Sequence, residues 1–163
     1  MKRFVALLLI AVSVLALASC GSVIDADAKD FSGEGMTITL TEGFTETKMD
    51  GYTLCYDSKE IAVFALKESF SLAAGFGDYT LAEYADLVHT ANAARNPGDI
   101  TDIEGLTCME YTFDNNGTVY SYLSVMYKAS DAFWLVQFTC KQADYEAFKP
   151  HMITWAKSVK FAG

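Results

Sequence analysis

Histidine and basic side chains are scarce in this chain. Its 163 residues include only two histidines, His89 and His151, which stand far apart in the sequence. No two cysteines form a Cys-x-x-Cys pair, so the sequence offers no ligand spacing typical of a zinc site. Twelve basic side chains face 21 acidic ones, a net charge of −9, and no basic patch stands out. These features argue against a metal site and against a nucleic-acid partner.

Catalytic motifs are also missing. No Gly-x-Ser-x-Gly surrounds a serine, and no Gly-x-x-x-x-Gly-Lys phosphate loop occurs. Cys108 or Cys140 could pair with His151 as nucleophile and base. Their neighbours are apolar, however, and apolar surroundings raise the pKa of a thiol and suppress its reactivity. We therefore expect a protein that is not an enzyme and that uses no cofactor.

The N-terminus carries an apolar run that is short for a membrane span. It follows the cationic start Met1-Lys2-Arg3 and ends in small residues, a pattern typical of an export signal. The end of the run, Leu17-Ala18-Ser19-Cys20, resembles the lipobox of bacterial lipoproteins. In that family the cysteine thiol is alkylated with a diacylglyceryl group, and the signal is cut just before it. The alternative is an uncleaved anchor helix with a chance cysteine.

The lipobox resemblance implies a location. Residues 1–19 would be a signal peptide, and lipid on Cys20 would hold the protein at the extracytoplasmic side of the cell membrane. Two or three acyl chains give lasting anchorage. The mature chain keeps 10 basic and 21 acidic side chains, a net charge of −11. Because an anionic lipid surface repels such a domain, the lipid must provide the attachment.

The mature chain divides into a tether and one domain. Residues 20–35 would comprise the cysteine whose lipidation the lipobox resemblance implies and a flexible tether, which their polar, unpatterned sequence indicates. Residues 36–163 have the size of a single domain with its own core. The three remaining cysteines, Cys55, Cys108 and Cys140, are odd in number and cannot all pair within the chain. We expect all three to be buried and free.

Alternating apolar residues predict several strands. Residues 36–40 form one, and residues 44–48 can return as a second after a turn at Glu42-Gly43. Further strands are predicted over residues 52–57, 61–66, 105–113, 119–128 and 132–140. The last three form a meander, with Asn116-Gly117 in a two-residue hairpin turn. This register places Cys108, Val125 and Val136 in a row. Both faces of the meander are largely apolar, so each needs cover.

Two helices are predicted. Thr80 and Glu83 form a capping-box pattern, so a helix starts after Thr80, and it must stop near Asn96-Pro97-Gly98. A second helix follows Asp144, which can cap its first turn, and has apolar residues at helical spacing up to residue 159. Pro150 lacks a backbone donor and is expected to kink or restart this helix.

The order of these elements resembles that of PsbP-like domains, the fold of an extrinsic photosystem II subunit and of a nuclear import factor that acts on the GTPase Ran. The likeness lies in MTITLTEGFTE near the start and ITWAKSVKF near the end. The matched positions are Glu42, Gly43 and Phe44, then Ser158, Val159 and Phe161. Thr41 stands where the family often has proline. The resemblance implies an α+β fold, an antiparallel β-sheet flanked by helices on both faces in an α/β/α sandwich. It implies no catalytic residues, and family members mostly bind proteins.

The most unusual connection is residues 69–79, SFSLAAGFGDY. It carries four large apolar side chains and two flexible glycines, Gly75 and Gly77. In one interpretation the side chains cover the open face of the sheet. In the other they form an adaptable apolar surface that binds a partner. The four candidate binding residues are Phe70, Leu72, Phe76 and Tyr79. We regard Phe76, which lies between the glycines, as serving binding more than folding.

Glu110 is a charged residue inside a predicted strand. It either contacts a ligand or ion, or lies where the cover of the sheet ends.

Together these features predict a lipid-anchored protein of the cell envelope that acts as a protein-binding or accessory module, with the membrane and an unknown envelope protein as partners. Two alternatives remain. A carrier or chaperone for a hydrophobic ligand or segment predicts an apolar cleft under the 69–79 loop. A hydrolase with an unrecognised site predicts a histidine or cysteine of perturbed pKa in a pocket.

Overall fold

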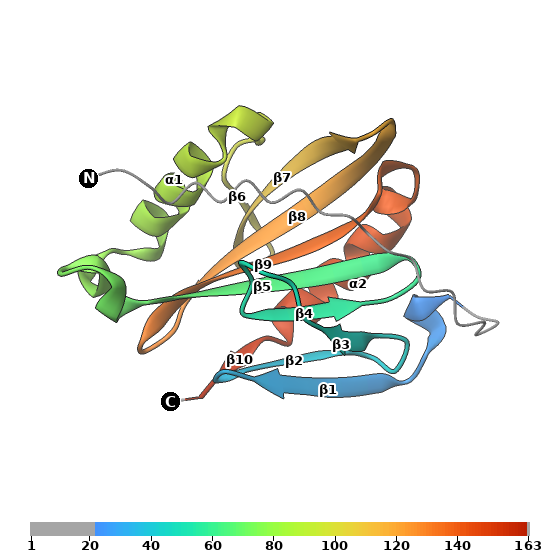
Figure 1. Cartoon of the computed structure of the whole chain (residues 1–163), viewed down its shortest axis with the longest axis horizontal. Helices are drawn as coiled ribbons and strands as arrows, with labels where there is room; N and C mark the ends of the chain where they lie inside the picture. The colour runs from blue at the N-terminus through green and yellow to red at the C-terminus, as the bar shows by residue number, and fades with distance from the viewer. Residues whose placement is uncertain (1–21, 163) are drawn as a thin grey trace.

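The computed structural model describes residues 22–162, which form an α+β fold of two antiparallel sheets and two α-helices (Figure 1). The predicted signal peptide and Cys20 lie outside the described residues. Within residues 22–162, no helix combines the length and the apolar character that crossing a membrane requires.

The large sheet has seven strands in the order β3-β4-β5-β9-β8-β7-β6. Their bounds are β3 (Thr45–Thr47), β4 (Leu54–Asp57), β5 (Ile61–Ser69), β6 (Thr101–Ile103), β7 (Leu106–Asn115), β8 (Thr118–Lys128) and β9 (Ala132–Lys141). The small sheet has the order β1-β2-β10, made of β1 (Ala28–Gly33), β2 (Met36–Thr41) and β10 (Lys160–Phe161).

The meander of β7, β8 and β9 has the predicted register. Cys108 pairs with Val125, and Val125 pairs with Val136. The turn between β7 and β8 consists of Asn116 and Gly117, both with positive φ (52° and 87°). This is the backbone of the two-residue turn whose twist matches that of the flanking strands, so it fixes the register of the hairpin.

Helices cover both faces of the large sheet, as predicted. Helix α2 (Tyr145–Lys157) and the small sheet lie over one face, which we call the α2 face. Its buried residues include Val63, Leu123, Trp134, Phe138 and Trp155. Helix α1 (Leu81–Ala91) lies over the other face, the α1 face, together with the 69–79 loop. Its buried residues include Tyr84, Met109, Met126, Phe133 and Leu135.

Helix α1 begins with the predicted capping box. The Thr80 hydroxyl accepts a hydrogen bond from the Glu83 amide (3.2 Å), and the Glu83 carboxylate accepts one from the Thr80 amide (2.7 Å). The helix ends at Ala91, earlier than predicted, and a 3₁₀ turn (Ala93–Arg95) follows it. Asn96 then adopts a left-handed conformation that stops the helical path.

Helix α2 is continuous through Pro150, so the helix does not restart there, and the Asp144 side chain makes no capping hydrogen bond. Apolar residues on both sides of the proline hold the helix on the sheet, which offsets the missing backbone bond. These residues are Tyr145, Phe148, Met152, Trp155 and Ala156.

The tether predicted over residues 20–35 is wrong for its second half. Residues 28–33 form β1, which pairs with β2 along its whole length. Before it, the Val23 side chain is buried, and the Val23 amide donates to Glu60 (2.7 Å). Strand β1 lies at the edge of the small sheet and buries one large side chain, Phe31, so its sequence lacks the alternation typical of a strand.

Strand β3 also differs from the prediction. Residues 45–47 do not return along β2. They pair with β4 at the edge of the large sheet, because Phe44 turns into the core against Trp155 with the ring centroids 5.3 Å apart. The three cysteines at positions 55, 108 and 140 are buried and free, as predicted.

Candidate binding site

The 69–79 loop consists of two 3₁₀ turns, Phe70–Leu72 and Phe76–Asp78. Gly75 opens the second turn with a φ of 78°, a conformation that favours glycine. Gly77 lies so close to the Phe70 ring that a Cβ atom at this position would be 3.0 Å from it. The two glycines therefore allow a tight turn that brings the two halves of the loop together.

Phe70 and Phe76 pack onto the α1 face. Their ring centroids lie 5.2 and 5.3 Å from that of Phe133. Phe76 also contacts the rings of Tyr79 (5.9 Å) and Tyr84 (6.3 Å). Both phenylalanines are half-buried. This packing favours the first interpretation of the loop for these two residues and does not fit a Phe76 side chain devoted mainly to binding.

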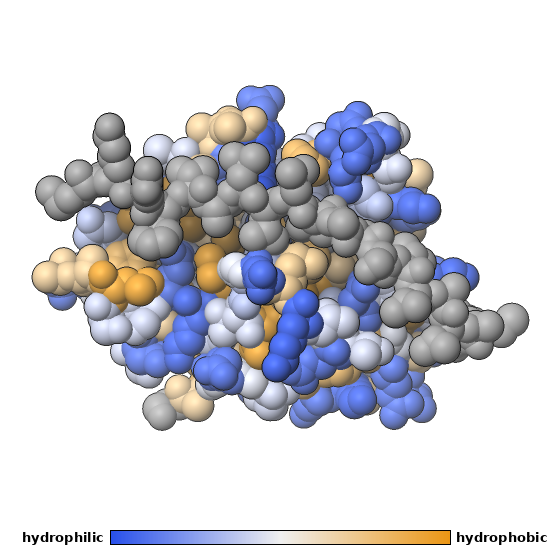
Figure 2. All heavy atoms as spheres, in the orientation of Figure 1, coloured by the Kyte–Doolittle hydropathy of each residue, from blue (hydrophilic) through white to orange (hydrophobic). Residues whose placement is uncertain are grey.

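Leu72 and Tyr79 remain outside. Their exposed fractions are 67% and 39%. Leu72, Ala73 and Ala74 form a projection that we call the apolar tip, and Figure 2 shows apolar side chains at this place on the left of the view. The structure thus separates the four predicted binding residues into two that pack inward and two that face solvent.

Lys128, at the end of β8, fixes this loop. Its Nζ donates hydrogen bonds to the carbonyl oxygens of Gly77 (3.0 Å) and Tyr79 (2.6 Å). The same ammonium lies 5.7 Å from the Phe70 ring centroid and 5.5 Å from that of Phe133. The apolar tip is therefore presented on a loop that hydrogen bonds and aromatic packing hold in place.

A second cluster on the α1 face was not identified from the sequence. Gln137, buried in the middle of β9, uses its whole amide group. Its Nε2 donates to the Tyr111 hydroxyl (2.8 Å) and the Ser124 hydroxyl (3.0 Å), and its Oε1 accepts from the Tyr52 hydroxyl (3.3 Å). These residues come from three adjacent strands and from the loop before β4. We call this group the tyrosine cluster.

Aromatic stacking orders the tyrosine cluster further. The Tyr111 and Tyr122 rings are parallel within 3° with centroids 4.7 Å apart, and Tyr52 stacks on Phe64 at 5.0 Å. Burial raises the pKa of Tyr52 to about 12, which the positive charge of Arg95 opposes. The Tyr52 phenol is therefore a neutral hydrogen-bonding group at ordinary pH.

Arg95 borders the tyrosine cluster. It lies in the 3₁₀ turn after α1 and is exposed. One guanidinium nitrogen lies 3.4 Å from the Tyr111 hydroxyl oxygen, and the guanidinium carbon lies 6.0 Å from the Phe113 ring centroid. Among the described residues, the salt bridges involve lysines, and none involves Arg95. The sequence offered one signal for this cluster, the polar Gln137 and Ser124 inside otherwise apolar strands.

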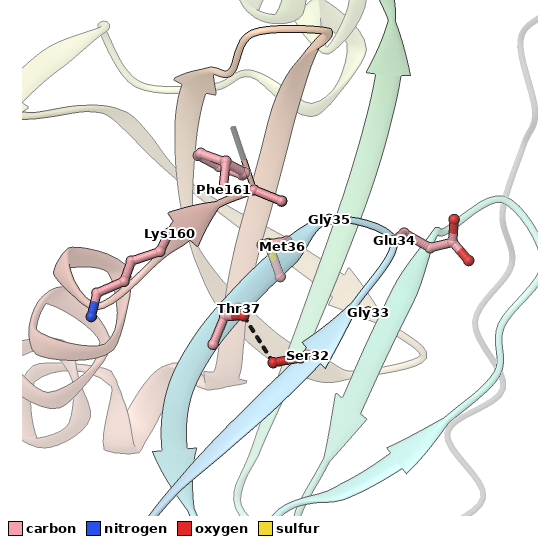
Figure 3. A pocket seen from close by; sticks show the side chains of 9 residues that line it. Ser32, Gly33, Glu34, Gly35, Met36, Thr37, Lys160 and Phe161 are labelled. Atoms are coloured by element: carbon pink, nitrogen blue, oxygen red, sulfur yellow. Dashed lines mark hydrogen bonds between the residues drawn. The ribbon is translucent and has the colours of Figure 1, made fainter.

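Two shallow depressions lie elsewhere. The first is formed by the β1–β2 hairpin and β10, where the Ser32 and Thr37 hydroxyls are hydrogen-bonded at 2.8 Å (Figure 3). In Figure 3 the Glu34 side chain points away from this depression, and Lys160 extends from its rim. The second depression lies along α2 beside Glu104. Neither is lined by histidine or cysteine.

The three thiols are buried, and Glu110 is hydrogen-bonded to residues of α2. Burial raises the pKa of Cys55 and Cys108, and it raises that of Cys140 to about 12. The Glu110 carboxylate accepts hydrogen bonds from Lys149 (2.8 Å) and from the Tyr145 hydroxyl (2.6 Å), and so joins β7 to α2. In residues 22–162 no three side chains are grouped as metal ligands.

No protein-family model matches this sequence, and no curated protein matches it. Solved structures share its fold at low identity. LpqN of Mycobacterium tuberculosis, a protein involved in cell envelope biogenesis, is 8% identical with a TM-score of 0.50, over 84% of this chain and 91% of LpqN. A protein from Bacteroides thetaiotaomicron is 11% identical with a TM-score of 0.53, over 85% of this chain and 49% of that protein.

A cyanobacterial PsbP protein, CyanoP of Synechocystis sp. PCC 6803, is 15% identical, over 89% of this chain and 98% of that chain, with a TM-score of 0.44. At these identities the likenesses concern the fold.

Proposed function

We propose that this chain is a lipid-anchored binding module on the extracytoplasmic side of a bacterial membrane and that it has no catalytic activity. The lipobox-like sequence ending at Cys20 supports the location. A similar fold occurs in LpqN, which is involved in cell envelope biogenesis.

The observation that carries this proposal is the fixed loop with an exposed apolar tip. Leu72 and Tyr79 face solvent, while Lys128 and the Phe70–Phe76 packing hold the loop behind them. Exposed apolar residues on a rigid support are typical of docking surfaces, because little conformational entropy is lost on binding. Asp78 is exposed in the same loop, and Glu83 is exposed in the first turn of α1 that follows it, so the expected partner combines an apolar anchor with basic side chains.

The position of the tip favours a protein partner over the bilayer. The first described residues, near η1 (Val23–Asp25), lie at the right end of the longest axis in Figure 1, and the 69–79 loop lies at its left end. The described chain therefore begins at the end of the molecule opposite the tip. The acidic surroundings of the tip also disfavour an anionic membrane surface.

The carrier and hydrolase alternatives lack support in this region. Phe70 and Phe76 contact Phe133 and occupy space under the 69–79 loop that a carrier would need for its ligand. A hydrolase would need a reactive cysteine or histidine in a pocket. The buried thiols have raised pKa values instead, which lowers their nucleophilicity.

Photo-crosslinking in the native membrane tests this function. The full chain would carry benzoylphenylalanine at position 72 or, as a matched control, at position 87, where another exposed leucine lies on α1. We expect a discrete crosslinked protein from position 72 that disappears with Tyr79→Asp. Crosslinks that are the same from both positions, or that persist with Tyr79→Asp, would contradict a docking role of the tip.

A further inference from the structure

We propose that Arg95 and Tyr111 form a binding site for the carboxylate of a small molecule with a flat apolar body. This site lies at the tyrosine cluster, and it is separate from the docking surface of the proposed function. Arg95 and Tyr111 both have hydrogen-bond donors on the α1 face that no described residue uses.

The Tyr111 hydroxyl has a free proton. Its oxygen accepts hydrogen bonds from Gln137 Nε2 (2.8 Å) and from Arg95 (3.4 Å). A phenol oxygen has two acceptor positions, so both are occupied. Among residues 22–162, no hydrogen bond has the Tyr111 hydroxyl as its donor. Tyr111 is only 6% exposed, so an acceptor from outside would reach this proton beside the exposed Arg95.

Arg95 supplies the charge. A guanidinium has five N–H groups, and the bond to Tyr111 uses one of them. In the described part of this strongly acidic chain no carboxylate forms a salt bridge with Arg95. The remaining N–H groups suit the two oxygens of a carboxylate, which an arginine binds in a planar, bidentate arrangement.

The neighbouring residues keep these donors in position. Gln137 is buried, and its three hydrogen bonds hold Tyr111, Ser124 and Tyr52. Stacking on Tyr122 fixes the plane of the Tyr111 ring. Donors that are already oriented bind an anion at a smaller entropic cost than mobile surface lysines do.

Apolar surface lies beside the charged group. Phe113 is 42% exposed, and its ring faces the Arg95 guanidinium at 6.0 Å. Tyr52 is half-buried and stacked on Phe64. An aromatic or other flat body attached to the carboxylate could therefore contact ring faces while its charge meets Arg95.

Benzoate is the probe for this site, because it combines a carboxylate with one aromatic ring. The full chain, purified in a non-ionic detergent, would be labelled with ¹⁵N-arginine. The sequence contains two arginines, Arg3 and Arg95, so Arg95→Gln assigns the side-chain signal. We expect the Arg95 Nε–Hε signal to shift with benzoate and to saturate. A signal that does not move would overturn the proposal.

Equilibrium dialysis of radiolabelled benzoate against the variants separates the contributions of Arg95 and Tyr111 to the binding affinity. Loss of a charge-assisted pair in Arg95→Gln is expected to weaken binding about tenfold or more. Arg95→Lys keeps the charge without the planar fork and is expected to weaken binding by less than Arg95→Gln. Tyr111→Phe removes the donor and is expected to weaken binding about threefold to tenfold.

Lys160→Gln is the matched control, because it removes one positive charge from the small sheet on the other side of the molecule. It is expected to bind benzoate like the wild type. Equal affinity in wild type and Arg95→Gln would overturn the site. If acetate bound as tightly as benzoate, the proposed contact between the site and a flat apolar part of the ligand would be wrong. If inorganic phosphate bound more tightly than benzoate, the proposed preference for a carboxylate would be wrong. The crosslinking at position 72 does not depend on any of these results.

Discussion

The ring centroid of Phe76 lies 5.3 Å from that of Phe133, with the planes inclined at 64°. Through this contact Phe76, which lies between Gly75 and Gly77, joins the 69–79 loop to β9, the middle strand of the large sheet. Phe76 is therefore part of the cover of the α1 face. Leu72, four residues earlier in the same loop, is exposed to solvent and has a different role.

Phe76→Ala is expected to destabilise the protein. Replacing a fully buried phenylalanine by alanine lowers the free energy of unfolding by about 3–5 kcal/mol. Because Phe76 is half-buried, we expect about half of that loss, measured by urea unfolding. Trp155→Ala, in the core of the α2 face, is the reference for a full loss, and Leu72→Ala is expected to stay within about 0.5 kcal/mol of wild type. A Phe76→Ala variant as stable as Leu72→Ala would show that the ring contacts contribute nothing.

Lys128→Met is expected to loosen the 69–79 loop. The substitution keeps an apolar stem near Phe133 and removes the two hydrogen bonds to the carbonyl oxygens of Gly77 and Tyr79. Each such bond contributes about 1 kcal/mol or somewhat more. Hydrogen–deuterium exchange of the loop amides is expected to accelerate about tenfold, while amides of β9 stay protected. Lys141→Met, an exposed lysine on β9, serves as the control, and equal exchange in both variants would rule out this role of Lys128.

Cys20→Ala is expected to abolish acylation and membrane attachment, because the thiol is the acceptor of the lipid in the lipobox family. Cys20 lies outside the described residues, so this test rests on the sequence alone. Partition into a detergent phase and mass spectrometry of the mature N-terminus would measure it. An acylated Cys20→Ala protein in the detergent phase would refute the assignment.

The buried thiol of Cys140 is expected to make the protein sensitive to alkali. Its pKa is raised to about 12 by burial, with the charge of Asp144 adding to the effect, against 9.0 for a free thiol. The unfolded chain therefore releases this proton at lower pH than the folded chain does. The contribution of the protonated Cys140 thiol to the free energy of unfolding is complete below about pH 9. It is lost as the pH rises from about 9 towards 12. In urea unfolding at a series of pH values, Cys140→Ala is expected to lose stability less steeply above pH 9, and an unchanged slope would contradict this origin.

Local patterns predicted the meander and the first helix because each is specified by neighbouring residues. Asn116-Gly117 selects one type of turn, and that turn sets the pairing of Cys108 with Val125. The capping box at Thr80 likewise depends on one helical turn. The closing helix was predicted in outline, but its continuity through Pro150 depends on packing against the sheet, which a local pattern does not contain.

The missed features depend on contacts between distant segments. Strand β1 buries only Phe31 among its large side chains, so the sequence lacks the alternation of a typical strand. The tyrosine cluster brings Tyr52, Tyr111 and Gln137 together across a separation of 85 residues. Arg95 joins them only because α1 crosses the same face of the sheet and ends beside the cluster. The sequence could place each strand residue on a face, but not these neighbours across the face.

If Cys20 carries lipid as proposed, the ordered start of the fold limits the distance between the domain and the membrane. Ser22 donates a hydrogen bond to Glu60 at 3.0 Å, and Val23 is already buried. Only Gly21 stands between Ser22 and Cys20. Two residue spacings of extended chain reach about 7 Å. With lipid on Cys20, a connection of this length would keep Ser22 within about 7 Å of the lipidated residue. The end of the molecule near η1 would stand close to the lipid headgroups, and the 69–79 loop would be carried at the far end of the long axis.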